Sequence, residues 1–251
     1  MGTIDSFFLI KHYKQEEETK MIGIEKLEVF GWEAAVRGMR NPMNSWDKGD
    51  SGYVECIECK FLGDVPTYKF TIGKNDLDLM KRLVAAGTDH SKFMRTINVI
   101  CDITAPLYWW KEFDTYKVGT VANSCSTMHK IHEKEFTLDD FSHEHLVDQY
   151  DSDDVECIAC WKDCLVDTIR FLNRGRKAYL KTKDKRYWWQ MIQLLPSSYN
   201  QKRTVQLNYA VLRNMYYSRK NHKLDEWRNF CAWVEGLPYS ELITMNNGGK
   251  E

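Results

Sequence analysis

The sequence predicts an α/β fold of the α+β kind, on two observations. Met21–Phe30 and Arg95–Thr104 alternate apolar and polar side chains with the period of a β-strand. Several other segments carry apolar residues at helical spacing and begin at capping residues such as Asn or Thr. With 251 residues and 13% aromatics, the chain can bury one sizeable core or two small ones.

The overall charge is nearly balanced. Lys and Arg number 35 and Asp and Glu number 36, so the net charge is −1 and no global field attracts nucleic acid or membranes. No run of about 18 apolar residues marks a transmembrane span. The first residues show neither a basic region nor a cleavage site typical of a signal peptide. We therefore expect a cytoplasmic protein without a membrane or nucleic-acid partner.

Residues 21–87 are expected to contain two strands and two helices. Proline and glycine mark several of their ends, because proline disfavours helix at the residue before it and glycine suits the position after a helix. In order, the expected elements are the strand Met21–Phe30, a helix Trp32–Met39 stopped before Asn41-Pro42, a polar loop Asn44–Gly52, an ambiguous segment Tyr53–Gly63, a short strand Tyr68–Ile72, and a helix capped by Asn75 and closed by Gly87.

The centre of the chain combines an aromatic helix with a polar loop. The strand Arg95–Thr104 leads into a helix with Pro106 at its first position. Aromatic residues lie on most sides of this helix, so we expect it in the core or at a subunit interface, with a wall for a planar ligand as the functional alternative. The loop Val118–His129 is rich in Thr, Asn, Ser and Cys, which indicates either a ligand site or an ordinary turn-rich connection.

The C-terminal half is expected to be mainly helical. Its expected elements are a capping residue Thr137, a long helix from Ser152 to about Arg174 closed by Gly175, a helix Asp184–Leu195 stopped by Pro196, an extended segment Ser198–Leu207, a helix capped by Asn208 that runs to about Lys220, a last helix Leu224–Leu237, and a disordered tail Met245–Glu251.

Cysteine spacing raises the possibility of a metal site. Four of the eight cysteines form two C-x-x-C pairs, which could together bind one structural zinc ion. The first pair is Cys56 and Cys59, and the second is Cys157 and Cys160, about a hundred residues later. Cys157, Cys160 and Cys164 also follow helical spacing, which favours buried thiols on one helix face.

A series of residues along the chain resembles the signature of the flavin-dependent thymidylate synthases (ThyX). Ala105-Pro106-Leu107 opens the aromatic helix, and Thr115-Tyr116-Lys117 stands where that family has Arg-His-Arg. Further matches in order and spacing are Arg95, in the place of a family His, then Thr120, Asn123, Ser126, Met128-His129, Leu195-Pro196, Asn208, Arg219, His222 and Trp227.

The resemblance implies a single ThyX-like domain over residues 1–251. Its fold would be a mostly antiparallel sheet flanked by helices, in a homo-oligomer and favouring a tetramer. It also implies FAD as cofactor, a folate one-carbon donor, and transfer of the one-carbon unit to C5 of dUMP. Such chemistry needs no protein nucleophile, so no catalytic residue is assigned.

The implied binding roles fall into two groups. The cofactor-binding residues would be Arg95, Lys117, Thr120, Asn123, Asn208 and His222. The substrate-binding residues would be Ser126, His129 and Arg219. Purely structural roles are the alternatives, since Asn208 also fits a helix cap and Arg219 a favourable charge at a helix C-terminus.

Other functions remain open at this level. The replacement of Arg-His-Arg favours a non-catalytic scaffold that binds a nucleotide or a partner. A dUMP hydroxymethylase that serves a modified phage genome would fit the altered polar loop. A zinc-stabilised nucleic-acid binder is disfavoured by the net charge of −1.

Overall fold

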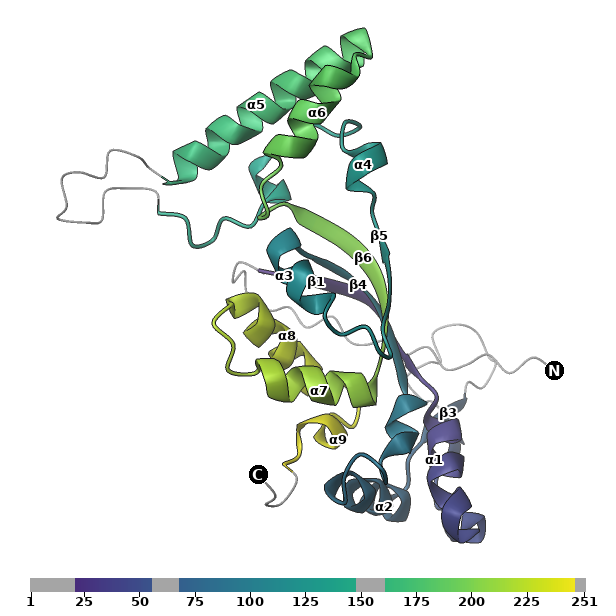
Figure 1. Ribbon diagram of the computed structural model, residues 1–251. Coiled ribbons are helices and arrows are strands. Elements are labelled where there is room, and N and C mark those ends of the chain that lie inside the picture. Colours follow the sequence, from purple (N-terminus) through teal and green to yellow (C-terminus); the bar gives the residue numbers. More distant parts are fainter. Residues whose placement is uncertain (1–20, 56–67, 148–160, 247–251) are drawn as a thin grey trace, which may run out of the picture.

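The computed structural model describes residues 21–55, 68–147 and 161–246 (Figure 1). Its centre is a four-stranded sheet in the order β1-β4-β6-β5, in which every pairing is antiparallel. The strands are β1 (Gly23–Phe30), β4 (Asn98–Pro106), β6 (Asn200–Asn208) and β5 (Val121–Ser124). A separate antiparallel pair joins β2 (Gly52–Glu55) to β3 (Tyr68–Thr71). The predicted fold class is thus confirmed.

Nine α-helices and four short 3-10 helices complete the described part of the chain. The α-helices are α1 (Trp32–Arg40), α2 (Lys74–Ala85), α3 (Leu107–Phe113), α4 (Thr127–Lys130), α5 (Trp161–Thr182), α6 (Lys185–Leu194), α7 (Tyr209–Arg219), α8 (Asp225–Glu235) and α9 (Glu241–Thr244). The 3-10 helices are η1 (Asn41–Met43), η2 (Trp46–Lys48), η4 (Lys92–Arg95) and η5 (Leu138–Asp140).

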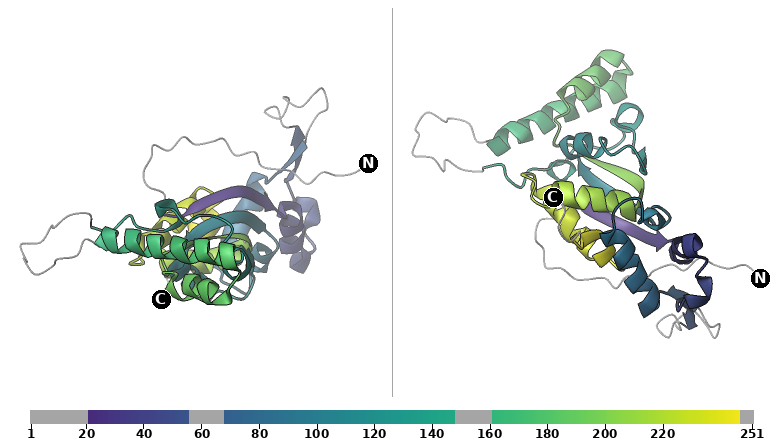
Figure 2. Two further views of the ribbon diagram at one scale, coloured as in Figure 1. Left: turned by 90° about the horizontal axis from the view of Figure 1, so that it is seen from above. Right: turned by 60° about the horizontal axis from the view of Figure 1, so that its bottom comes forward.

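One face of the sheet is apolar. On β4, Val99, Cys101 and Ile103 are buried, as the alternation in the sequence predicts. The intervening Asp102 lies on the other face, where the Thr204 hydroxyl donates to it across the strands at 2.6 Å. Helices α3, α7 and α8 contribute to the core on the apolar face (Figures 1 and 2).

The aromatic helix α3 belongs to this core. Trp109 and Trp110 are fully buried. The Trp109 ring centroid lies 4.7 Å from that of Trp227 and 5.8 Å from that of Phe230, both on α8. We expected α3 in the core or at a subunit interface, and the structure places it in the core.

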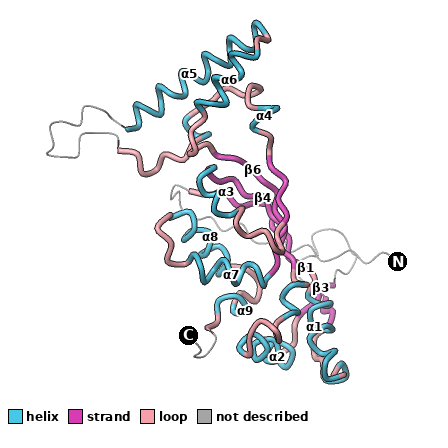
Figure 3. Tube along the Cα trace, in the orientation of Figure 1, coloured by secondary structure: helices cyan, strands magenta, loops and turns pink. Residues whose placement is uncertain are grey.

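Helices α5 and α6 form a separate layer, here called the arm (residues 161–194). They lie side by side at one end of the molecule (Figures 1 and 3). A second hydrophobic cluster joins the arm to the segment before it, through Ile131, Phe136, Phe141, Leu165, Ile169, Leu172 and Met191. The described residues therefore form two apolar clusters.

The predicted helix end at Gly175 is wrong. Helix α5 continues through this residue to Thr182. A Cβ atom at Gly175 would lie 3.5 Å from Met191 Cγ and 3.5 Å from the Tyr187 carbonyl oxygen on α6. The glycine therefore permits close packing of the two helices and does not end one of them.

Of three predicted helix starts, at Asn75, Pro106 and Asn208, one is confirmed and two are wrong. Asn208 caps α7 as predicted, because its Oδ1 accepts from the Val211 N–H at 3.0 Å. Asn75 is not the cap of α2; the distant Asp50 carboxylate accepts from the N–H groups of Asn75 and Asp76 at 2.8 and 3.0 Å. Pro106 is the residue before α3, not its first residue.

The predicted loop Val118–His129 contains regular structure. Val121–Ser124 forms the edge strand β5, which pairs with β6, and Thr127–Lys130 forms α4. All four residues of β5 are exposed. Their sequence lacks the alternation of a half-buried strand, so only the hydrogen bonds to β6 reveal it.

Some predictions fall outside the described residues. These are the two cysteine pairs, the start of the helix predicted from Ser152, and residues 247–251 of the tail. In the part that is described, Cys101, Cys125, Cys164 and Cys231 are free thiols. None of the described helices combines the length and apolar character needed to cross a membrane.

Candidate functional site

Two predicted site residues meet where α3 ends and α7 turns into α8. The Glu112 carboxylate accepts from Arg219 Nη1 at 2.6 Å and from the Trp227 indole N–H at 2.8 Å. His222 Nε2 lies 3.4 Å from the same oxygen, and Arg219 Nε donates to the Tyr116 hydroxyl at 2.8 Å. We refer to Glu112, Tyr116, Arg219, His222 and Trp227 as the Arg219 cluster.

The neighbouring elements fix this arrangement. Asn208 ends β6 and caps α7, so the eleven residues of α7 carry Arg219 to its C-terminus. Strand β4 runs directly into α3, which places Glu112 at the helix end near Arg219. The guanidinium carbon of Arg219 lies 4.8 Å from the centroid of the buried Trp227 ring.

The cluster is electrostatically compensated within the chain. Arg219 and Glu112 side chains are 17% and 34% exposed, so water only partly screens their attraction. One Glu112 oxygen lies near the three donors on Arg219, Trp227 and His222. An anionic ligand at Arg219 would therefore compete with Glu112 for the guanidinium.

Two more predicted residues lie at the turn that follows α3. Thr120 Oγ1 donates to the Tyr116 carbonyl oxygen. Gly119 has a φ of +80°, and a Cβ atom there would lie 2.7 Å from Asn208 Nδ2. Because only glycine fits this close approach without strain, the turn that carries Thr120 packs against Asn208 at the start of α7. Arg219 lies at the other end of that helix, about 16 Å away.

The remaining predicted residues are exposed. Asn123 lies opposite Thr204 in the β5–β6 register. Ser126 caps α4 by accepting from the His129 N–H at 3.0 Å. Lys117 lies in the turn after α3 and makes no ion pair with a described residue.

Arg95 lies apart from these residues at the end of η4, a segment in contact with α1 and α7. Its side chain is exposed. Within the described ranges, no hydrogen bond or ion pair connects Arg95, Ser126 or His129 to the Arg219 cluster. The structure of the single chain thus brings together Arg219 and His222. Thr120 is bonded to the backbone of Tyr116, and Asn208 lies at the opposite end of α7.

A buried carboxylate next to the cluster carried no role in the sequence analysis. Glu226 is 3% exposed and accepts from the Tyr108 hydroxyl. Tyr108 also lies 3.0 Å from Ser142 Oγ, which donates to Glu144 at 2.8 Å. Burial and the neighbouring Glu226 carboxylate raise the pKa of Tyr108, so this phenol stays a hydrogen-bond donor.

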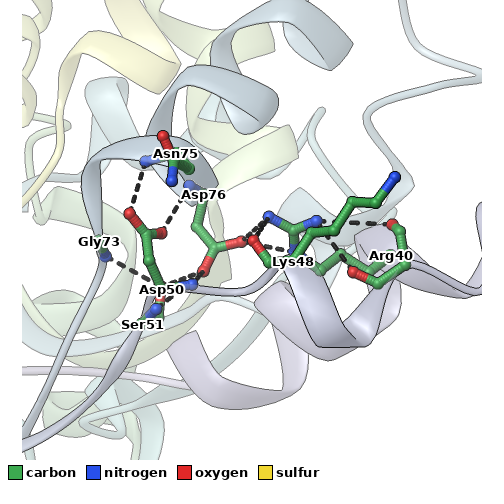
Figure 4. A network of polar contacts seen from close by, with 8 residues as sticks. Arg40, Lys48, Asp50, Ser51, Gly73, Asn75 and Asp76 are labelled. Atoms are coloured by element: carbon green, nitrogen blue, oxygen red, sulfur yellow. Dashed lines mark hydrogen bonds and ion pairs between the residues drawn. The ribbon is translucent and has the colours of Figure 1, made fainter.

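A second polar network lies near β2 and β3 (Figure 4). Asp76 is fully buried; its Oδ1 accepts from Arg40 Nε at 2.6 Å and its Oδ2 from Ser51 Oγ at 2.6 Å. Arg40 also donates to the carbonyl oxygens of Ser45 and Lys48 at 3.0 and 2.9 Å. Burial alone would raise the pKa of Asp76, but the hydrogen bonds from Ser51 and Arg40 and from two backbone N–H groups lower it.

Arg40, Ser51 and Asp76 of this network line a hollow of about 500 Å³. The apolar side chains of Val36, Trp46 and Phe70 and the cation Arg37 also line it. The sequence analysis gave Asp76 no role. Its partner Arg40 lies 36 residues earlier, and no local motif connects the two.

The predicted zinc site is not among the described residues. Its four proposed ligands, Cys56, Cys59, Cys157 and Cys160, all lie outside the described ranges. Within those ranges, no three His, Cys, Asp or Glu side chains are grouped to hold an ion. Zinc binding by Cys56 and Cys59 together with Cys157 and Cys160 therefore stays a prediction.

Comparisons with known proteins show the fold. The sequence matches no protein-family model and no curated protein. Two crystal structures of ThyX from Helicobacter pylori, both with FAD and dUMP, resemble it at TM-scores of 0.57 and 0.59 with 14% sequence identity. The matches cover 88% and 91% of this chain and 94% and 99% of the other chains. The chain therefore has a ThyX-like fold over nearly its whole length.

Proposed function

We propose that this protein is a divergent ThyX-like enzyme that binds FAD and dUMP and transfers a one-carbon unit to C5 of the uracil. The observation that carries the proposal is the fold, because the two similar structures bind FAD and dUMP. The position of Arg219 and His222 beside the polar turn gives this chain a place for a nucleotide.

Donors in the turn after α3, on β5 and at the start of α4 also suit a nucleotide. Lys117 is an exposed cation, and Thr120, Asn123 and Ser126 offer hydroxyl and amide groups that can bond phosphate or base oxygens. These residues, with Asn208, would hold the flavin nucleotide and substrate. When bound and reduced, FAD would supply the hydride that converts the transferred methylene group into a methyl group.

Arg219 has the central role among the chain's own residues. Its guanidinium is anchored by Tyr116 and Glu112, so its direction is fixed before a ligand arrives. A fixed cation can stabilise negative charge that develops on a uracil oxygen or is present on phosphate. Glu112 has the opposite effect, because it already neutralises the guanidinium and lowers its affinity for anions.

Calorimetric titration with dUMP tests this role. We expect Arg219→Ala to weaken dUMP binding by about tenfold or more, the usual size for a lost charged hydrogen bond. Glu112→Gln should strengthen binding, since it removes the competing charge and keeps the side-chain shape. Arg82→Ala, which removes an exposed arginine on α2, is the control. Equal dUMP affinity in all four proteins would remove Arg219 from the site.

A homo-oligomer, with four subunits favoured, is part of the same proposal. The exposed residues of β5 and α4 would then meet residues of other subunits to complete the site. Light scattering tests this directly: a mass near four chains of 29.7 kDa supports it, and a stable monomer contradicts it.

A non-catalytic nucleotide-binding scaffold is the second candidate. The compensation of Arg219 by Glu112 favours it, as does Thr115-Tyr116-Lys117 in place of three basic family residues. An assay with FAD, a reductant, dUMP and methylenetetrahydrofolate separates the candidates. Formation of thymidylate supports the enzyme, formation of a hydroxymethylated nucleotide supports the variant chemistry, and dUMP binding without turnover supports the scaffold.

A further inference from the structure

The charges of this chain are segregated between the arm and the rest. Residues 161–194 contain nine Lys or Arg and three Asp, a net charge of +6, although the whole chain carries −1. All other residues together therefore carry −7. The nearly neutral net charge of the whole chain therefore does not reflect the basic charge of the arm, and it says little about what the arm binds.

Four basic residues form one line along α5. Arg170, Arg174, Lys177 and Lys181 follow spacings of four, three and four residues, which places them on one face of a helix. All four are exposed, whereas Leu165, Ile169 and Leu172 point into the second cluster. We call these four residues the basic stripe. It extends about 16 Å along the helix.

The basic stripe is weakly neutralised. Arg174 and Lys181 make no ion pair with any residue that the structure describes. Arg170 pairs with Asp167 at 2.7 Å, but both side chains are at least 60% exposed. Lys177 lies 3.8 Å from Glu135 on an exposed surface. Exposed pairs of this kind contribute little, so all four cations remain available to a polyanion.

Exposed aromatic rings accompany the cations of the arm. Phe171 is 56% exposed, and the Arg174 guanidinium lies 5.4 Å from its centroid. On α6, Trp189 is 42% exposed, with Lys185 Nζ 5.7 Å from its ring centroid. Helix α6 faces Gly175 of α5 with Tyr187, Gln190 and Met191, so Trp189 lies on the side of α6 away from α5 and only Phe171 adjoins the basic stripe. Single-stranded nucleic acids are bound by this combination, since cations contact the phosphates and rings stack on unpaired bases.

We propose that the arm is a binding surface for single-stranded nucleic acid. The basic stripe contacts successive phosphates, and Phe171, beside Arg174, offers a stacking surface for a base. The surface is built from α5, so this activity does not depend on the nucleotide site at Arg219.

Two other occupants fit the surface less well. An amphipathic helix that enters a membrane needs a continuous exposed apolar face, whereas the apolar face of α5 is buried in the second cluster. The acidic remainder of a second copy of the chain could attract the arm, but its net charge of −7 is spread over more than 200 residues, whereas a nucleic-acid strand carries one negative charge on every phosphate. Both remain outcomes of the test.

Fluorescence anisotropy with a labelled oligothymidylate tests the proposal on the full-length protein. We expect salt-sensitive binding that Arg174→Ala/Lys181→Ala weakens. The slope of log affinity against log salt concentration should fall by about 1.4, because each lost phosphate contact on a single strand contributes about 0.7. Phe171→Ala should weaken binding about tenfold, the typical loss of one stacked base.

The control variant Arg82→Ala/Lys92→Ala removes the same charge from exposed positions outside the arm and should bind like the wild type. Equal losses in the two double variants would reduce the effect to net charge and overturn the proposal. So would tighter binding to vesicles of phosphatidylserine than to the oligonucleotide. If the wild-type protein does not bind the oligonucleotide, and Arg174→Ala/Lys181→Ala changes the oligomeric state, the arm is instead a contact between copies of the chain.

Discussion

The Arg219 cluster and the basic stripe use arginine in opposite ways. At the cluster, the chain supplies its own carboxylate, hydroxyl and indole partners to Arg219. Along the stripe, the cations are exposed and their few acidic partners are weak. The first arrangement fixes one guanidinium in a set direction, and the second leaves several charges free for a polyanion. Partners and burial, not the number of cations, therefore decide what each region can bind.

The ion pair Arg40–Asp76 is more deeply buried than either region, so its loss should have the largest effect on the free energy of unfolding. Its side chains are 7% and 0% exposed. Asp76→Ala leaves the Arg40 charge buried without its counter-ion, so we expect a loss of about 3–5 kcal/mol in the free energy of unfolding. Urea denaturation measures this loss. A loss below about 1 kcal/mol would show that water reaches the pair.

The same pair predicts a pH dependence. The pKa of Asp76 is lowered from 3.8, so its stabilisation is complete above pH 3.8 and disappears as the pH falls through the lower folded-state value. Asp76→Asn should therefore flatten the loss of stability in this acid range. Unfolding curves of both proteins at neutral and acid pH measure the effect; parallel pH profiles would contradict it.

A substitution in the Arg219 cluster should lower the free energy of unfolding by an intermediate amount. Glu112→Ala leaves the buried Trp227 N–H without its acceptor and Arg219 without its counter-ion. We expect a loss of about 2 kcal/mol, the typical consequence of an unsatisfied buried donor. Glu112→Gln is the matched control, because its amide oxygen can still accept from Trp227. Equal losses for the two variants would assign the effect to the charge alone.

The stripe should give the smallest effect on stability. Asp167→Ala removes the partner of Arg170, but both side chains of this pair are exposed. We expect a change within about 0.5 kcal/mol in urea denaturation. The variant should instead bind oligothymidylate at least as tightly as the wild type, since it removes a negative charge beside the stripe.

Local interactions made most of the fold predictable. The alternation of β4 and the Asn208 cap depend on neighbouring residues, so the sequence displays them. The predictions for Asn75 and Gly175 are wrong because distant residues decide their roles: Asp50 caps α2, and Met191 packs against Gly175. The edge strand β5 was missed because all its residues are exposed.

The candidate site was predictable only in part. Arg219 and His222 follow from the resemblance to ThyX, and the structure places them together. Glu112 was missed because it lies 107 residues before Arg219 and no local pattern signals the pair. The basic stripe could have been found, since its helical spacing is visible in the sequence, but the net charge of −1 concealed it.

The central proposal is that this ThyX-like fold binds flavin, and one measurement tests it most directly. Purified protein is mixed with FAD, filtered to remove free cofactor, and its visible absorbance is recorded. We expect the retained protein to show the two visible bands of oxidised flavin. A colourless protein, with all FAD in the filtrate, would contradict the proposed flavin chemistry.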